Sequence, residues 1–182
     1  MKRNKILAGI VCFSLVFCMF MTGCKAAGTG GEEPLSGSAR EILTSVADTA
    51  TAAAGDNIPM TVDVPVTDEN VTQLLGLSAE NFRSLTEDAY VLTGAIMTHA
   101  FELALVKCKD AAAAADVKKQ IAEGFDAGQW ICVFPEQCFV IDSGTFVLLY
   151  AGTNAGGEAV LNAFSDEAQG NVGDINIFYR FE

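Results

Sequence analysis

Apolar residues recur every three to four positions in several stretches of the chain, which is the spacing of an α-helix that packs along one face. The clearest stretch spans residues 110–128, where Asp110 suits the N-cap position and an alanine-rich sequence follows. A second helix is predicted over residues 39–54, with Gly55 at its C-terminus. Shorter helices are predicted over residues 67–75, from Ser78 onward and over residues 158–164. The apolar stripe of the clearest helix consists of Ala114, Val117, Ile121 and Phe125.

Segments rich in β-branched, aromatic and aliphatic residues alternate with these helices and predict strands. Residues 89–97 and 101–108 are separated by a three-residue link, which predicts a hairpin. A helix over residues 96–107 is the alternative, because Ala, Leu and Met also suit helices. Two prolines restrict residues 60–66 to an edge strand or an extended connector. The remaining predicted strands span residues 131–134, 139–142, 145–150 and 175–181.

The order of these elements predicts an α+β two-layer sandwich. Hairpins separated by helices favour a mostly antiparallel sheet of about four to five strands with helices packed on one face. The other face of such a sheet normally carries polar residues, but here the predicted strands are apolar on both faces. In residues 101–108, for example, Phe101, Leu103 and Leu105 share one face, and Glu102, Ala104 and Val106 share the other.

The face without helices is therefore a candidate partner face. It is predicted to consist of Ala104, Val106, Val140, Val147 and Leu149. An exposed apolar surface of several hundred Å² is unusual on a monomer and would serve a partner or a dimer. The alternative is that the apolar tail, residues 175–181, folds over this face and covers it.

The N-terminal residues carry the pattern of an export signal. A positively charged start is followed by an uncharged apolar run over residues 6–21. At about 1.5 Å per residue, this run spans roughly 24 Å, which is short of the roughly 30 Å hydrocarbon core of a bilayer. The run therefore fits the apolar part of a signal peptide better than a membrane span.

The sequence Met-Thr-Gly-Cys at the end of this run resembles the lipobox of bacterial lipoproteins. The resemblance implies cleavage after residue 23 and attachment of diacylglycerol to Cys24, which would anchor the protein in the cell membrane, facing the outside of the cytoplasm. A plain signal peptide or a single anchor helix is the alternative. Residues 1–23 are thus predicted to be a signal peptide, residues 24–38 the lipidated cysteine with a flexible tether, and residues 39–182 a single α+β domain.

The charge of the chain narrows the choice of partners. Removing residues 1–23 takes away three of the 11 basic residues and none of the 23 acidic residues, which leaves a net charge of −15. Such a chain repels nucleic acid and anionic lipid headgroups. Binding to the membrane must therefore come from the lipid on Cys24, and no nucleic-acid partner is expected.

Candidate catalytic residues are few. His99 is the only histidine, so any Ser–His–Asp or Cys–His arrangement would have to include it. It lies in a predicted turn, and the sequence contains no serine nucleophile elbow. We therefore interpret His99 as an exposed turn residue. Glu136 follows Pro135 and is the one acidic residue in an apolar setting; we interpret it as a turn residue as well. No catalytic residue is predicted.

Candidate ligand sites are equally sparse. The cysteines of the predicted domain, Cys108, Cys132 and Cys138, lack the Cys-x-x-Cys spacing of a zinc site. Cys132 and Cys138 lie symmetrically about a proline and are a candidate disulfide, with separate buried thiols as the alternative. The acidic residues at 166–174 lack the order of a calcium loop, and the Gly-rich residues 152–157 lack the ending of a phosphate loop, which favours a strand-to-helix turn there. No metal and no cofactor is predicted.

The order of motifs resembles one known family. A hairpin ending in the sequence ELALVKCKD is followed by an Ala/Lys-rich helix, by a Phe-Pro-Glu element at residues 134–136, and by a strand, TFVLLYAG, that leads into a final helix. Together with the lipobox and the tether, this order resembles the lipoproteins of clostridial-type bacteria that carry the domain of unknown function 4358. The resemblance covers residues 42–164 and implies no functional residues, because the family has no established activity.

These observations predict a membrane-anchored extracytoplasmic lipoprotein. Its domain is expected to be a non-catalytic binding or interaction module for a protein or for a component of the cell envelope. A purely structural accessory of other envelope proteins is a related hypothesis. The alternative of a different class is a carboxylate-based hydrolase or transferase that acts on cell-envelope material through two converging acids.

Overall fold

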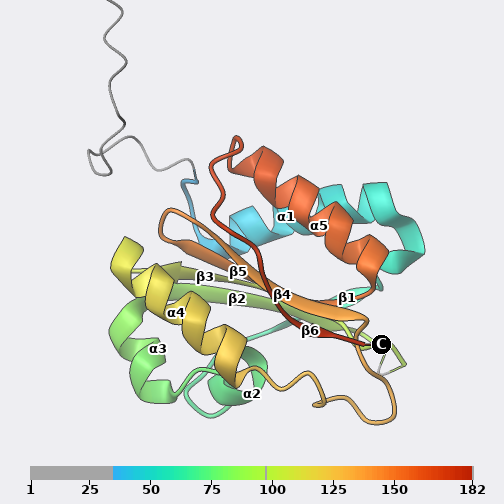
Figure 1. Cartoon of the computed structure of the whole chain (residues 1–182), viewed down its shortest axis with the longest axis horizontal. Coiled ribbons are helices and arrows are strands. Elements are labelled where there is room, and N and C mark those ends of the chain that lie inside the picture. Colours follow the sequence, from blue (N-terminus) through green and yellow to red (C-terminus); the bar gives the residue numbers. More distant parts are fainter. Residues whose placement is uncertain (1–34, 97, 182) are drawn as a thin grey trace, which may run out of the picture. The chain divides into compact units, whose positions relative to one another are not determined.

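The computed structural model describes residues 35–96 and 98–181, and this part of the chain is organised around a six-stranded antiparallel sheet (Figure 1). The strand order is β1-β2-β3-β5-β4-β6, so β1 and β6 are the edge strands. The strands are β1 (Thr61–Val64), β2 (Thr86–Gly94), β3 (Glu102–Cys108), β4 (Gln137–Ser143), β5 (Phe146–Gly152) and β6 (Asn176–Arg180). The helices are α1 (Ala39–Ala54), the 3-10 helix η1 (Gly55–Asn57), α2 (Val71–Leu75), α3 (Ala79–Leu85), α4 (Ala111–Gly124) and α5 (Asn154–Glu167).

Polar caps define where the long helices begin. At the start of α1, the Ser38 hydroxyl accepts the N–H of Glu41, and the Glu41 carboxylate accepts the N–H of Ser38, which forms a capping box. At the start of α4, Asp110 accepts a backbone N–H, as its residue type predicts. The two long helices expected from apolar periodicity are thus confirmed, although α4 ends at Gly124 rather than at residue 128.

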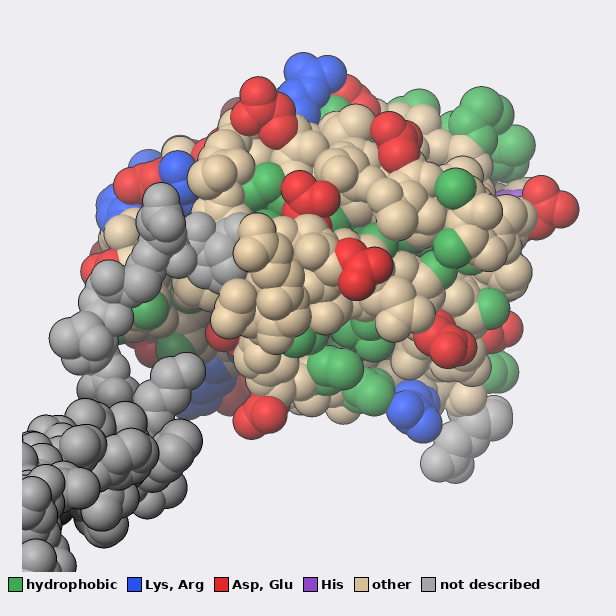
Figure 2. Space-filling view, turned by 90° about the horizontal axis from the view of Figure 1, so that it is seen from above, with side chains coloured by type: hydrophobic (Ala, Val, Ile, Leu, Met, Phe, Trp, Pro, Cys, Tyr) green, Lys and Arg blue, Asp and Glu red, His purple; other side chains and the backbone are tan. Residues whose placement is uncertain are grey.

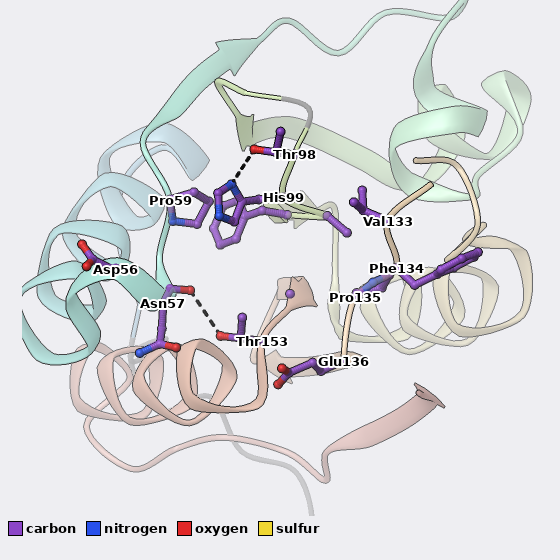
Figure 3. A pocket seen from close by; sticks show the side chains of 13 residues that line it. Asp56, Asn57, Pro59, Thr98, His99, Val133, Phe134, Pro135, Glu136 and Thr153 are labelled. Atoms are coloured by element: carbon purple, nitrogen blue, oxygen red, sulfur yellow. Dashed lines mark hydrogen bonds between the residues drawn. The ribbon is translucent and has the colours of Figure 1, made fainter. Parts of the chain in front are cut away.

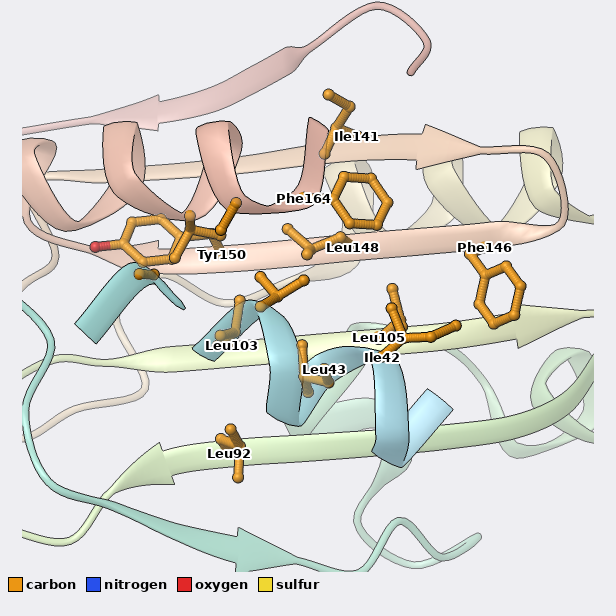
Figure 4. Packing of buried hydrophobic residues seen from close by; sticks show 14 of the residues in the cluster. Ile42, Leu43, Leu92, Leu103, Leu105, Ile141, Phe146, Leu148, Tyr150 and Phe164 are labelled. Atoms are coloured by element: carbon orange, nitrogen blue, oxygen red, sulfur yellow. The ribbon is translucent and has the colours of Figure 1, made fainter. Parts of the chain in front are cut away.

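Helices cover both faces of the sheet (Figure 1). α1 and α5 pack against each other over one face, and α4, together with α2 and α3, covers the other. The α+β fold class with an antiparallel sheet is confirmed, and the sheet carries one helical layer more than expected. The core under α1 and α5 contains large side chains, among them Leu103, Leu105, Phe146, Leu148, Tyr150 and Phe164 (Figure 4). The core under α4 contains smaller ones, among them Ala104, Val106, Cys138, Val140, Val147 and Leu149.

The candidate partner face is not exposed, which corrects the sequence-based expectation. The five residues of this face are each 0% exposed and belong to the core under α4: Ala104, Val106, Val140, Val147 and Leu149. The expectation placed all helices on one side of the sheet, whereas the stripe of α4, through Ala114, Val117 and Ile121, packs on the second side. Central strands that are apolar on both faces need a cover on both, and α4 supplies the second one.

The C-terminal tail extends the sheet, so the second alternative for this face is corrected too. β6 pairs with β4 in antiparallel register, with a shift between Cys138 and Phe139 that marks a bulge. Next to this bulge, the ring of Phe178 lies 6.0 Å from the ring of Phe125 at the end of α4. Ile177 stays exposed at the free edge. The alternating tail therefore forms an edge strand rather than a lid over a face.

The β2–β3 hairpin is confirmed, and its two faces are those expected. Residues 131–134, by contrast, do not form a strand but belong to the connection between α4 and β4. Their apolar composition suggested a strand, but this segment pairs with none of the six strands of the sheet. Ile131 and Phe134 consequently project from a loop and remain exposed.

The two ends of the sheet differ in role. At one end the described chain enters the fold, because the N–H of Ala39 donates to Asp88 Oδ2 near the start of β2 over 2.9 Å. α1 then runs along the sheet to the other end, where the Thr153 hydroxyl, just after β5, donates to the carbonyl of Asn57 over 3.3 Å. The nine residues of β2 span about 30 Å between these ends.

Candidate functional site

A cleft of about 240 Å³ opens at the end of the sheet away from residue 35 (Figure 3). Four chain segments meet there: the turn after α1, the β2–β3 link, the end of the α4–β4 loop and the β5–α5 link. Its polar lining consists of Asp56, Asn57, Thr98, His99, Glu136 and Thr153. Its apolar lining includes Pro59, Phe101, Val133, Phe134 and Pro135.

The floor of the cleft is aromatic and buried. Phe101 is buried and packs edge-on against Tyr150, with ring centroids 6.0 Å apart. The Tyr150 hydroxyl donates to the carbonyl of Thr153 over 2.8 Å. Burial raises the pKa of Tyr150 well above its usual value, so the hydroxyl keeps the proton that this bond needs. Gly152 completes the floor, where a Cβ would lie 2.5 Å from Tyr150 Oη.

His99 reaches the cleft through a tight turn. Its N–H donates to the carbonyl of Ile96 over 3.4 Å, and its Nδ1 lies 3.2 Å from Thr98 Oγ1. The residue is exposed and in a turn, as the sequence indicated, and its ring also lines the cleft. The turn therefore gives the single imidazole a surface position where a ligand can reach it.

Glu136 joins the cleft to the start of α5. Its Oε2 accepts the N–H of Asn154, the first residue of the helix, over 2.7 Å. A carboxylate is favoured there by the positive end of the helix dipole. Its backbone is fixed on both sides, because its N–H donates to Gly152 and its carbonyl accepts from Phe181. Glu136 lies in the bend before β4, as expected of a turn residue, and the structure adds that it binds the first N–H of α5, next to the N-cap residue Thr153.

The Gly-rich residues 152–157 form a strand-to-helix turn, as the sequence favoured. A Cβ at Gly156 or Gly157 would lie 2.4 or 2.3 Å from the nearest atom of the underlying sheet residues, so these glycines let α5 lie directly on the sheet. The first N–H of α5 is already bound by Glu136. Both observations give the glycines a packing role rather than the phosphate-binding role of the alternative.

A second hollow, of about 380 Å³, adjoins the cleft and shares Asp56, Pro59 and His99 with it. Met60 and Ile96 line this hollow and are 71% and 55% exposed. On the other side of the cleft, Phe134 and Phe181 are 55% and 63% exposed, and their rings stack 5.9 Å apart. Figure 2 shows hydrophobic side chains standing out at one end of the molecule. Large apolar side chains grouped around a hollow mark a binding surface.

The charge of the two hollows is negative. Asp56 and Glu136 line them, and no Lys or Arg does so among the described residues. Within the same part of the chain, the Asp56 carboxylate has no hydrogen-bond or ion-pair partner, and Glu136 has one oxygen without a partner. Six of the seven basic side chains in the described part of the chain are bound away from the cleft: Arg40 to Asp63, Arg83 to Asp68, Lys107 to Glu87, Lys109 to the Ser84 carbonyl, Lys118 to Asp142 and Lys119 to Glu123. The seventh, Arg180 of β6, is exposed and lies opposite Gln137, next to Glu136, but lines neither hollow.

The structure does not join Cys132 and Cys138, the candidate disulfide. Cys138 lies in β4 and is buried toward α4, whereas Cys132 is exposed in the α4–β4 loop, and both are free thiols. Cys108 is a buried free thiol as well. Burial raises the pKa of Cys108 and of Cys138 to about 12. Symmetric spacing about a proline suggested a turn, but one cysteine lies in a strand under a helix and the other in an open loop.

The candidate sites for lipidation and for metal binding lie either outside the described residues or in a described region that forms no metal site. Cys24 lies outside the described residues, so its lipidation stays a prediction. Within residues 35–96 and 98–181, no helix is long and apolar enough to cross a membrane. The same residues contain no group of three or more His, Cys, Asp or Glu side chains placed to hold a metal ion. In the region of the calcium alternative, Glu167 instead accepts the Ser45 hydroxyl of α1 over 3.0 Å.

One carboxyl is buried outside the cleft. Glu102 in β3 is 1% exposed, and its Oε1 has no hydrogen-bond partner in the described part of the chain. Its side chain faces the α4 side, where Ala151 and then Cys138 follow in the same row across the sheet. Burial raises its pKa well above the usual value. The sequence indicated the face on which Glu102 lies but not its burial.

Sequence reasoning considered His99 and Glu136 separately and did not consider Asp56. His99 and Glu136 could have been placed together only from the strand pairing. Because β5 runs antiparallel to both β3 and β4, these two strands begin at the same end of the sheet, just after His99 and Glu136. Comparison of the chain with protein-family models, with curated proteins and with solved structures gives no match. The resemblance to the domain of unknown function 4358 therefore stays a prediction, and the function has to be argued from the cleft itself.

Proposed function

We propose that this protein is a membrane-anchored extracytoplasmic lipoprotein whose domain binds a partner in the cleft lined by His99 and Glu136. The observation that carries the proposal is the open cleft with its exposed apolar border, in a fold whose two sheet faces are both covered. The lipobox resemblance at Cys24 supports the anchor. The acidic net charge supports attachment through lipid rather than through a basic surface.

The position of the cleft suits an anchored receptor. An anchor at Cys24 joins the domain at residue 35, and the cleft lies at the opposite end of the sheet. A flexible tether of the length predicted here reaches about 20 Å. Such a tether lets the domain turn, so a partner outside the bilayer can reach the cleft.

Carboxylate-based hydrolysis is the second candidate, and one observation favours it. Asp56 and Glu136 line the same cleft, as a reaction with two acids requires. Against it, Glu136 is already bound to the first N–H of α5, and the carboxyl with the strongly raised pKa, Glu102, is buried and does not line the cleft. An acid/base pair needs its raised-pKa member next to the substrate. Binding without chemistry is therefore the better-supported function.

Site-specific photo-crosslinking in living cells tests the proposal. A photoreactive residue replaces Thr98, which lines the cleft, and in a matched control it replaces Ala112, which is exposed at the start of α4. We expect a discrete crosslinked product from position 98 and none from position 112. Equal crosslinking at both positions, or no product at either, contradicts a binding function of the cleft.

A further inference from the structure

We propose that the ligand of the cleft is a basic peptide segment in which Lys or Arg alternates with apolar residues. The inference deepens the proposed function and rests on it, because it assigns the class of partner to the same cleft. Three features of the described residues carry it: carboxylate oxygens without a partner, apolar side chains beside them, and two adjoining hollows with more volume than one side chain fills.

The charge of the hollow selects a cationic ligand. Figure 3 shows Asp56, His99 and Glu136 on three different segments around the cleft, with Asp56 at its outer margin. Asp56 has no partner in the described part of the chain, and Glu136 uses only Oε2, for the N–H of Asn154. Arg40 and the basic residues of α3 and α4 are held by acids or carbonyls elsewhere. Arg180, opposite Gln137, lines neither hollow, so the lining itself contains no basic side chain that compensates the two carboxylates. An anionic ligand is disfavoured, because Glu136 already occupies the helix end that would attract it.

The walls of the hollow select apolar groups next to the cation. Phe134 stacks on Phe181 at one side, and Met60 and Ile96 border the other, all four exposed. Burying an apolar side chain against such a wall contributes about 25 cal/mol for each Å² removed from water. Aromatic faces also attract Lys and Arg directly. A purely polar cation would leave these side chains in water.

The extent of the hollow selects an extended chain rather than a small amine. The cleft and its neighbour share Asp56, Pro59 and His99, and their volumes are about 240 and 380 Å³. Together they offer more space than one ammonium group with a short stem fills. An extended peptide places successive side chains on alternate sides, so alternating basic and apolar residues can face acids and apolar walls in turn.

Fluorescence anisotropy with defined peptides tests this inference on the full-length lipidated protein in a neutral detergent. The probe is a labelled peptide of about seven residues, which spans roughly 23 Å when extended, with Leu and Lys in alternation. One comparison peptide has Glu in place of every Lys, and another has Ser in place of every Leu. Free lysine serves as a small-amine competitor. We expect the Leu/Lys peptide to bind most tightly, the Glu peptide not to bind, and free lysine not to compete.

Charge variants locate the binding. Asp56→Asn and Glu136→Gln are each expected to weaken binding of the Leu/Lys peptide by about three- to fivefold, and the double variant by roughly tenfold or more. The glutamine side chain keeps an oxygen that can accept the N–H of Asn154, so the helix cap is retained. The matched control is the double variant Glu80→Gln and Asp116→Asn, which removes two exposed carboxylates outside the cleft lining and is expected to leave binding unchanged.

Each contrary result has a distinct meaning. Equal weakening by the control pair shows general attraction to an acidic protein and overturns the inference. Binding of the Glu peptide, competition by free lysine, or self-association of the protein without peptide binding overturns it as well. If position 98 still crosslinks in cells while the Leu/Lys peptide fails to bind, only the ligand class is refuted. If neither occurs, the proposed function fails.

Discussion

Replacement of Glu102 by glutamine is expected to stabilise the fold at neutral pH, by an amount that grows with pH. The wild-type carboxyl is 1% exposed, with no partner for Oε1 among the described residues, and burial raises its pKa well above the usual value. The folded protein therefore keeps Glu102 protonated. The unfolded chain releases that proton near the ordinary pKa of about 4.3.

The sign and the size of the effect follow from this difference in proton binding. Below the ordinary pKa, both states of the wild type are protonated, and the two proteins differ little in this term. Above it, only the unfolded wild type loses the proton, so its folded state loses about 1.4 kcal/mol of stability for each pH unit, until the raised pKa of the folded state is reached. The glutamine of the variant has no proton to lose, so the variant lacks this loss.

Urea unfolding of wild type and Glu102→Gln from about pH 4.5 to about pH 7.5 measures the difference in unfolding free energy. Glu158→Gln, which changes an exposed carboxylate, is the matched control and is expected to show no such trend. A constant difference between Glu102→Gln and wild type across this range would refute the reasoning. It would mean that Glu102 is ionised in the folded protein.

Four further outcomes are expected. Gly76→Ala should lower the free energy of unfolding, measured by equilibrium unfolding, by about 1–2 kcal/mol because φ is +69°, and by a further amount of about 1–3 kcal/mol because a Cβ would lie 2.4 Å from the backbone of α4. A variant as stable as the wild type would contradict this close packing. Val147→Lys should cost several kcal/mol because it buries a charge, whereas Val62→Lys on the edge strand should change the urea midpoint little; equal effects would argue for an exposed central face. In the native protein, Cys132 should react with iodoacetamide before the two buried thiols, and mass spectrometry showing equal labelling would contradict their burial. Cys24→Ser should release the protein from the membrane fraction or leave it unprocessed, and freshly made wild-type protein with an unmodified N-terminus downstream of Cys24 would refute lipidation.

The elements whose borders are set by local chemistry could be predicted from the sequence. α1 spans residues 39–54 as expected, because a serine cap and a glycine enclose one apolar stripe. The two prolines near β1 limited this segment to an edge strand or an extended connector, and the structure contains the edge strand. The turn between β4 and β5 is also set locally, because Gly144, with a φ of +60°, adopts the left-handed backbone that favours glycine.

The number of layers could not be predicted, because it depends on which helix meets which face. The stripe of α4 consists largely of Ala and Val, so its apolar pattern does not reveal which face of the sheet it covers. The cleft escaped prediction for a related reason. Glu136 and His99 are far apart in the chain and meet only because β3, β5 and β4 are neighbours in the sheet.

The burial of both sheet faces limits where a partner can bind. The edges are poor docking strands: β1 has only four residues and is followed by Pro65, and β6 carries a bulge next to β4. Both devices oppose the addition of a further strand. The cleft end, by contrast, combines exposed apolar side chains with unpaired carboxylates. The core is complete without a ligand, so filling the cleft does not have to complete the fold, and the contacts made there can contribute to affinity and to the choice of partner.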